Sequence, residues 1–141
     1  MKNIIDVTAD AGNFKILLSA FKSAALIDML RSPGQYTLFA PTDEAFRRMP
    51  AGSLDAMFKD GRTLKPFLRS HIMNGAMASN DILPGPLDSL EGKTLRASLD
   101  GSRININDAT IVDSDMRASN GVVHAVDAVL VPTAAALDAV A

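Results

Sequence analysis

Few residues in this chain combine a reactive side chain with a neighbour that could activate it. The 141 residues include two histidines, His71 and His124, and no cysteine, so any nucleophilic or metal chemistry would rest on imidazole, hydroxyl and carboxylate groups. Ser70 precedes His71, but adjacent side chains in a helix point about 100° apart, which is poor geometry for a serine–histidine pair. A metal site would need both histidines together with Asp43 or Asp127. Aspartates at a helix start or beside a strand end usually bind backbone N–H groups, so structural roles are favoured.

Motifs that hold cofactors are absent from the sequence. There is no glycine-rich phosphate loop, no HExxH pair and no Gly-x-Ser-x-Gly elbow. The methionines are dispersed, which favours core packing over a copper-binding ladder. The sequence therefore predicts no cofactor, no bound metal and no enzymatic activity. One alternative stays open, a small-ligand binder or enzyme with a polar site near His71, His124 or Asp43.

Both histidines fall on apolar faces of the elements expected around them. A helix capped by Thr63 is predicted from the helical spacing of Leu64, Phe67, Leu68, His71 and Ile72. His124 lies in an expected strand and faces the same way as Val122 and Val126. A histidine on such a face is more often buried and hydrogen-bonded than reactive. We therefore expect both side chains to be buried and neutral.

Residues 35–40 predict an internal strand, because apolar residues occupy both of its faces. Pro41 ends this strand, and Thr42 is placed as the N-cap of a helix through residues 43–46. Asp43 and Glu44 then lie in the first turn, where the helix dipole favours negative charge. The paired carboxylates thus have a structural explanation that competes with acid–base chemistry.

Helical spacing dominates the first half of the chain and strand alternation the last part. Phe14, Leu17, Leu18 and Phe21 form one apolar stripe, with short helices expected at 4–7 and 26–30. A further short helix is expected after Ser53, and Gly61 should stop it. From Thr94 the pattern has period two, with turns predicted at Asp100-Gly101, Asn107-Asp108 and Asn120-Gly121. Pro132 should end the final strand, and the pattern as a whole predicts an α+β fold.

Composition fits a folded domain without a nucleic-acid footprint. Hydrophobic residues make up 48% and charged residues 21%, typical of a globular chain. The formal net charge of −2 and the absence of a long basic run argue against nucleic acid as a partner. No apolar run reaches the roughly 18 residues that a membrane span needs. Asn3 and Asp6 interrupt any signal peptide after Met1, so either export is absent or a leader has been replaced.

Three segments resemble the signature motifs of fasciclin (FAS1) domains. They are TLFAPTDEAFRRMP at 37–50, LRSHIMNGAMASNDI at 68–82 and NGVVHAVDAVLVP at 120–132. The middle segment departs from the family pattern, because Ser70 stands where a tyrosine is usual. The resemblance implies one fasciclin-like domain over residues 1–141, with a core of about 3–132. It also implies twisted, wedge-like antiparallel β-sheets covered by a helical layer from the N-terminal half.

The same resemblance carries expectations about function. It implies a non-enzymatic adhesion or cell-envelope interaction module that is secreted, periplasmic or on the cell surface and binds a protein or another macromolecule. The lack of N-glycosylation sequons favours a bacterial over an animal extracellular member, and a length of 141 residues fits a single domain. The resemblance implies structural roles for the motif residues Thr42, Asp43, His71, Gly121, His124 and Asp127.

One short element of the chain is a candidate for partner binding. Asn80, Asp81 and Ile82 are similar to the Asp-Ile element with which animal fasciclin domains present a carboxylate and an apolar side chain to integrins. Gly75, Ser79 and Pro84 to Pro86 flank the tripeptide, which favours a surface loop. The alternative is structural, with Asp81 as a loop cap and Ile82 as a core anchor.

Overall fold

The computed structural model describes residues 2–32, 34–48, 59, 61–82, 84–90, 94–101, 103–107 and 109–129. The helices are α1 (Ile4–Ala11), α2 (Lys15–Ser23), α3 (Ile27–Arg31), α4 (Asp43–Arg47), α6 (Gly61–Arg69) and the short 3-10 helix η1 (Ser79–Asp81). The strands are β1 (Tyr36–Pro41), β2 (Ile72–Asn74), β3 (Gly85–Asp88), β4 (Thr94–Asp100), β5 (Arg103–Ile106), β6 (Ala109–Ala118) and β7 (Gly121–Val126). The helix expected after Ser53 and the strand end expected at Pro132 lie outside the described residues.

The strands form one mixed sheet in the order β2-β1-β7-β6-β5-β4-β3. Strand β1 is internal, as its two apolar faces predicted, and lies between β2 and β7. The pairing of β1 with β7 is parallel, with Tyr36 opposite Gly121, whereas every other pair of the described strands is antiparallel. The expected sheet is therefore corrected at this one pair. Strands β1 and β7 are not joined by a hairpin, so no turn in the sequence predicts their pairing.

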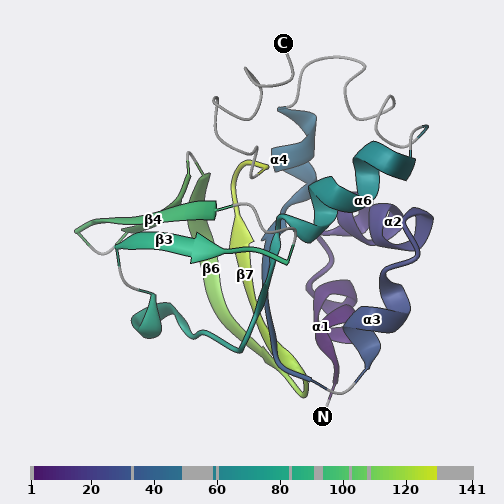
Figure 1. The fold of residues 1–141 in the computed structure, drawn as a ribbon, viewed down its shortest axis with the longest axis horizontal. Coiled ribbons are helices and arrows are strands. Elements are labelled where there is room, and N and C mark those ends of the chain that lie inside the picture. The colour runs from purple at the N-terminus through teal and green to yellow at the C-terminus, as the bar shows by residue number, and fades with distance from the viewer. Residues whose placement is uncertain are drawn as a thin grey trace.

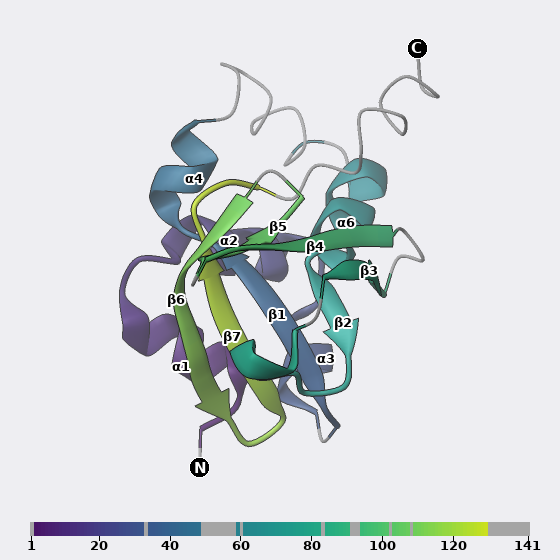
Figure 2. The ribbon, with the colours of Figure 1, turned by 90° about the vertical axis from the view of Figure 1, so that its left-hand side faces the viewer.

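Strand β6 divides the sheet into two differently oriented parts. Its first residues, Ala109 and Thr110, pair with β5, and its remaining length pairs with β7 through two register shifts. Bulges of this kind bend and twist a strand. Figures 1 and 2 show the result, since β3 and β4 run across the direction of β1 and β7. The α1, α2 and α3 helices cover the face of β1 and β7 that is turned away from β3 and β4 (Figure 1).

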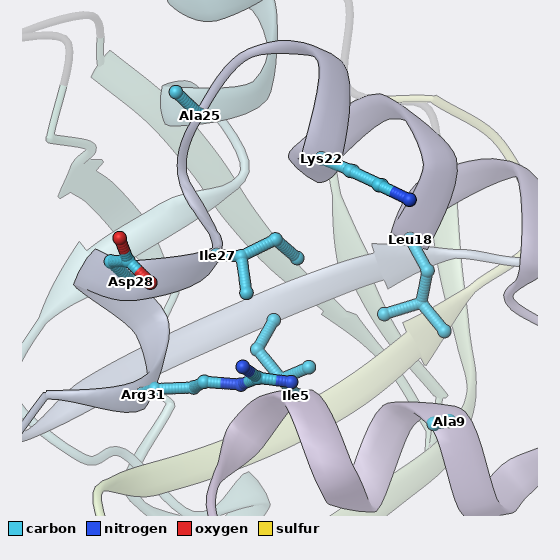
Figure 3. Close-up of a pocket in the computed structure, with 8 residues that line it drawn as sticks. All are labelled: Ile5, Ala9, Leu18, Lys22, Ala25, Ile27, Asp28 and Arg31. Carbon is cyan, nitrogen blue, oxygen red and sulfur yellow. The ribbon is translucent and has the colours of Figure 1, made fainter.

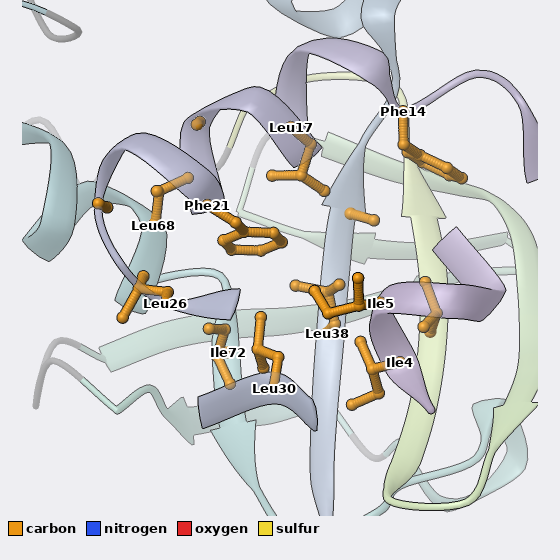
Figure 4. Packing of buried hydrophobic residues seen from close by; sticks show 14 of the residues in the cluster. Ile4, Ile5, Phe14, Leu17, Phe21, Leu26, Leu30, Leu38, Leu68 and Ile72 are labelled. Carbon is orange, nitrogen blue, oxygen red and sulfur yellow. The ribbon is translucent and has the colours of Figure 1, made fainter. Parts of the chain in front are cut away.

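Two hydrophobic clusters lie on opposite faces of β1. Leu38 points into the cluster beneath the helices, where it meets Ile4, Phe21 and other fully buried side chains (Figure 4). Ala40 belongs to the same cluster. Phe39 points the other way, into a second cluster with Leu95 and Ile106 from the β4–β5 hairpin. The strict alternation along β1 thus places one strand between both cores, which explains why neither of its faces is polar.

Several predicted boundaries are wrong, and the reasons are tertiary. Helix α6 begins at Gly61, so Thr63 lies inside it and is not its cap, and Pro66 lies in its interior. The helix ends at Arg69 because Ile72 pairs with Leu38 of β1, which makes that residue part of a strand. The predicted helix through Ile72 is therefore replaced by a helix, a turn and strand β2.

The β4–β5 hairpin is confirmed, with its turn shifted by one residue. Asp100 pairs with Arg103, so Asp100 ends the strand, and Gly101, at φ 62°, is the first turn residue. Asn107 adopts φ 54° in the next predicted turn. The sequence does not predict strand β3, because the Pro-Gly-Pro run at 84–86 favours a turn. Across the ranges given above, no helix has the length and apolar character needed to cross a membrane.

Candidate functional site

His124 holds the segment that leads to η1. Its Nδ1 accepts a hydrogen bond from the backbone N–H of Asp115 at 3.1 Å, and its Nε2 lies 2.7 Å from the carbonyl oxygen of Met77. Because Nδ1 accepts from an amide, the proton must be on Nε2, and the ring is the neutral tautomer. The imidazole stacks on Phe39 at a centroid distance of 5.9 Å and is fully buried. Burial lowers the pKa of His124 below its usual range, against the opposing effect of the Met77 carbonyl.

Asp115 binds the same segment at Ser79, two residues after Met77. Its Oδ1 accepts from the backbone N–H of Ser79 at 2.7 Å, and its Oδ2 accepts from the Ser79 hydroxyl at 2.5 Å. Asp115 lies in the irregular part of β6 with φ 62°, a backbone conformation that aspartate tolerates better than most residues. The Ser79 hydroxyl, followed by its N–H, lowers the pKa of this carboxyl group. The carboxylate is therefore charged at neutral pH and already engaged.

Strand β1 supplies a third anchor through Thr37. The Thr37 hydroxyl donates to the carbonyl of Gly75 at 2.6 Å and accepts from the N–H of Met77 at 2.8 Å. The N–H of Gly75 donates to the carbonyl of Gln35 at 2.8 Å. Residues 75–79 are thus bound to β7 by His124 and to β1 and β6 by contacts of Thr37, Ser79 and Asp115 that the sequence patterns did not predict. No local signal could have found these contacts, because each joins residues 36 or more positions apart.

Beyond these anchors the chain turns through η1 and returns to the core. The N–H of Ile82 donates to the carbonyl of Ser79 at 3.2 Å, and the Ile82 side chain is only 2% exposed in the second hydrophobic cluster. Asp81 is exposed. The candidate contact residues therefore have different roles. Ile82 is corrected from a contact residue to a core anchor, because burying its side chain stabilises the fold more than leaving it exposed would. Asp81 remains available, and the side chain of Asn80 is outside what the structure describes.

His71 is buried in a different environment. It follows the end of α6, where Nδ1 lies 2.9 Å from the carbonyl oxygen of Phe67 and the two rings are 4.9 Å apart. Burial lowers the pKa of His71 to about 4, with the Phe67 carbonyl acting in the opposite direction. Ser70 donates its hydroxyl to the carbonyl of Pro66 at 2.9 Å and is also buried. The expected burial of His71 is confirmed, but it comes from a turn and not from a helical stripe.

The aspartates of the two outer motifs bind backbone N–H groups. Thr42 Oγ1 accepts from the N–H of Ala45 at 3.2 Å, which confirms the predicted N-cap of α4. Asp43 Oδ1 accepts from Ile16 N–H at 2.8 Å, so it satisfies the first turn of α2. Asp127 Oδ1 accepts from Thr110 N–H at 2.8 Å.

Around Asp43 there is an open depression of about 540 Å³ with mixed charge. It is lined by Gly12, Asn13, Thr42, Asp43, Glu44, Arg47, Arg48, Val112 and Asp127. Arg48 Nη1 donates to the Asp127 carbonyl at 3.0 Å. Within the part of the chain that the structure describes, no three histidines or carboxylates are grouped to hold a metal ion.

The turn between β6 and β7 ties the strands to the helices. Asn120 is buried; its Oδ1 accepts from Ile4 N–H at 2.9 Å, and its Nδ2 donates to the carbonyls of Leu30 and Ser32 at 2.5 and 3.1 Å. Gly121 passes so close to β1 that a Cβ would lie 1.9 Å from the carbonyl oxygen of Tyr36. The predicted turn is shifted by one residue, because Ala118 pairs with Gly121, so Ser119 and Asn120 form the turn and Gly121 begins β7. Asn120 and Gly121 also have tertiary roles that the sequence did not reveal.

Comparison with known proteins identifies the family. Residues 12–132 match the family model of the fasciclin domain, and the chain therefore belongs to the fasciclin domain family. It is 33% identical over 131 residues to Protein sll1483 of Synechocystis sp., covering 92% of this chain and 73% of that protein. It is 31% identical over 131 residues to the uncharacterized protein sll1735 of the same organism, covering 92% of this chain and 98% of that protein.

Larger proteins contain the same unit. The chain is 36% identical over 135 residues to the transforming growth factor-beta-induced protein ig-h3 of Sus scrofa, covering 94% of this chain but only 20% of that protein. Its fold is similar to the FAS1 domain pair of the insect cell adhesion molecule fasciclin I, with a TM-score of 0.74 and 17% identity over 92% of this chain and 51% of that one. The expected α+β fasciclin fold is confirmed by this likeness, which at such identity concerns the fold only.

Proposed function

We propose that this chain is a non-enzymatic adhesion or interaction module of the cell envelope that binds another macromolecule through the loop carrying η1. The observation that carries the proposal is the exposed carboxylate of Asp81 on a segment fixed at its base to three strands. An anchored loop loses little conformational freedom on binding, so more of the contact energy is available for affinity. Membership of the fasciclin domain family supports the same class of function.

The expected partner presents a cationic or hydrogen-bond-donating group to Asp81. A lone exposed carboxylate favours charge-assisted contacts, which are stronger and more directional than neutral ones. Because Ile82 faces the core, its apolar side chain takes no part in the contact. The module would act outside the cytoplasm, as a secreted, periplasmic or surface protein, and residues 1–141 would form one domain with a core of about 3–132.

The contacts of the histidines speak against the alternative of an enzyme built on them. The Ser79 hydroxyl donates to Asp115, and the His124 nitrogens engage one backbone N–H and one backbone carbonyl. No ring nitrogen of His124 is thus placed to take a proton from a serine. One carboxylate oxygen of Asp43 already accepts a hydrogen bond from the N–H of Ile16 in α2.

The test replaces Asp81 by Ala and by Asn and measures binding to isolated cells or envelope fractions together with thermal unfolding. We expect binding to weaken about tenfold or more while the unfolding temperature stays nearly unchanged, because an exposed side chain contributes little to stability. Asp88→Asn, which removes another exposed carboxylate on β3, is the matched control and should bind like the unmodified protein.

A second variant tests the anchoring separately. Ser79→Ala removes a hydrogen bond to Asp115 without touching Asp81, so it should loosen the loop and weaken binding to a smaller extent. Unchanged binding by Asp81→Ala would place the adhesive surface elsewhere. Loss of binding in the Asp88→Asn control would show that only overall charge matters.

A further inference from the structure

A second concave surface lies on the helical side of the molecule, between α1, α2 and α3 (Figure 3). Its volume of about 530 Å³ falls within the range of roughly 300–1,000 Å³ that is usual for small-molecule sites. It is lined by Ile5, Ala9, Leu18, Lys22, Ala25, Ile27, Asp28 and Arg31. The η1 loop lies on the other side of the β1–β7 layer (Figure 1), so this groove is independent of the proposed adhesive loop.

The floor of the groove is aliphatic. Figure 3 shows Ile5, Leu18 and Ile27 pointing toward one another from three different helices, with Ala9 beside them. Ile5 is buried, whereas Leu18 and Ile27 are only partly covered and pack on the edge of the helical core. An apolar occupant would cover the remaining exposed surface of these side chains and gain the corresponding transfer free energy.

Two cations border this floor, and neither has a side-chain partner among the residues that the structure describes. Lys22 extends above Leu18, and the guanidinium of Arg31 lies beside Ile5 (Figure 3). Across the described ranges, the only ion pair is that of Lys2 with Asp10, and neither Lys22 nor Arg31 makes a side-chain hydrogen bond. The single carboxylate of the lining, Asp28, lies beyond Ile27 on the side away from Leu18 (Figure 3). The border therefore carries two cations against one carboxylate, although the whole chain has a formal net charge of −2.

We propose that this groove binds an amphipathic organic carboxylate, with its aliphatic chain on Ile5, Leu18 and Ile27 and its carboxylate held by Arg31 and Lys22. A guanidinium binds a carboxylate through two parallel hydrogen bonds, and an ammonium adds a point charge. A neutral apolar ligand would leave both cations unused, and a purely polar anion would leave the floor uncovered. The aliphatic floor and the charged border together favour a free carboxylate with an aliphatic chain over both of these ligands.

The test uses decanoate below its micelle concentration, titrated into the full chain by calorimetry. We expect saturable binding of one decanoate per chain, and binding about tenfold or more weaker for decyltrimethylammonium, which has the same chain length and the opposite charge. The double variant Lys22→Gln, Arg31→Gln should weaken decanoate binding by about tenfold or more, because each contact to a charged group is lost. Arg103→Gln on β5 is the matched control, since it removes a distant exposed cation.

A filling variant tests the groove itself without removing a charge. Ala9 is exposed on α1 and lines the groove, so Ala9→Phe should place a ring over the floor and abolish decanoate binding while leaving thermal unfolding nearly unchanged. Several of the outcomes overturn the proposal. These are an absence of saturable binding, equal binding of both amphiphiles, undiminished binding by the double or filling variant, and capture by phosphatidylglycerol vesicles or an acidic amphipathic peptide without binding of free decanoate.

Discussion

Acid should destabilise this fold through His71, and the size of the effect follows from its burial. The side chain is fully buried, and its pKa is lowered to about 4. An unfolded histidine has a pKa near 6.5, so between about pH 6.5 and pH 4 the unfolded chain binds a proton at this residue and the folded chain does not. The stability contributed by the neutral ring is complete above about pH 6.5, is lost as the pH falls, and stops declining below about pH 4.

The difference between the two pKa values sets the magnitude. Between about pH 7.5 and about pH 5, the free energy of unfolding should fall by about 2 kcal/mol from His71, with His124 adding a loss in the same direction. Asp115 does not contribute in this window. Its pKa is lowered, so its contribution is present above the range of an unfolded aspartate and is lost only at lower pH.

The assay is urea unfolding followed by circular dichroism at both pH values, for the unmodified protein and for His71→Gln. Glutamine retains a donor for the Phe67 carbonyl but does not titrate. The variant should be less stable at about pH 7.5 because it packs less well, and its deficit should shrink by about 2 kcal/mol at about pH 5. A deficit that is the same at both pH values would refute the claim that the buried ring resists protonation.

Three further substitutions test the contacts around the sheet by urea unfolding. Thr42→Ala should cost about 1 kcal/mol through loss of the N-cap to Ala45, and an unchanged midpoint would show that the cap contributes nothing. Asn120→Ala should cost about 3 kcal/mol, because it leaves three backbone groups of the helical layer without partners, and a loss under about 1 kcal/mol would contradict this role. Gly121→Ala should cost more than about 3 kcal/mol or prevent folding, since its Cβ would meet the Tyr36 carbonyl oxygen at 1.9 Å, and a stably folded variant would show that β1 and β7 can separate.

The candidate site was only partly predictable, and its residues show why. Both histidines were expected to be buried because they lie among apolar residues, which is a local pattern, and the cap at Thr42 depends on the next few residues only. For Ile82 the sequence left two alternatives open, a contact residue and a core anchor, and its burial supports the core anchor, whereas Asp81 is exposed as a surface loop predicts. A 3-10 helix of three residues is too short to show a repeating burial pattern, so no periodicity in the sequence separates Asp81 from Ile82.

Periodicity, turn residues and motif resemblance in the sequence determined the α+β class, the family, helices α1 and α2, the internal strand β1 and, to within one residue, the turn before β7. Only the tertiary structure decided that β1 runs parallel to β7, that residues 72–74 form a strand and that Asp115, His124 and Thr37 hold the η1 loop. Helix spacing and turns depend on residues a few positions apart, whereas the Ser79–Asp115 contact spans 36 positions and the Asn120–Ile4 contact spans 116. Such partners are chosen by which buried polar groups meet once the two cores have formed, because an unpaired group there costs more than the hydrogen bond itself contributes.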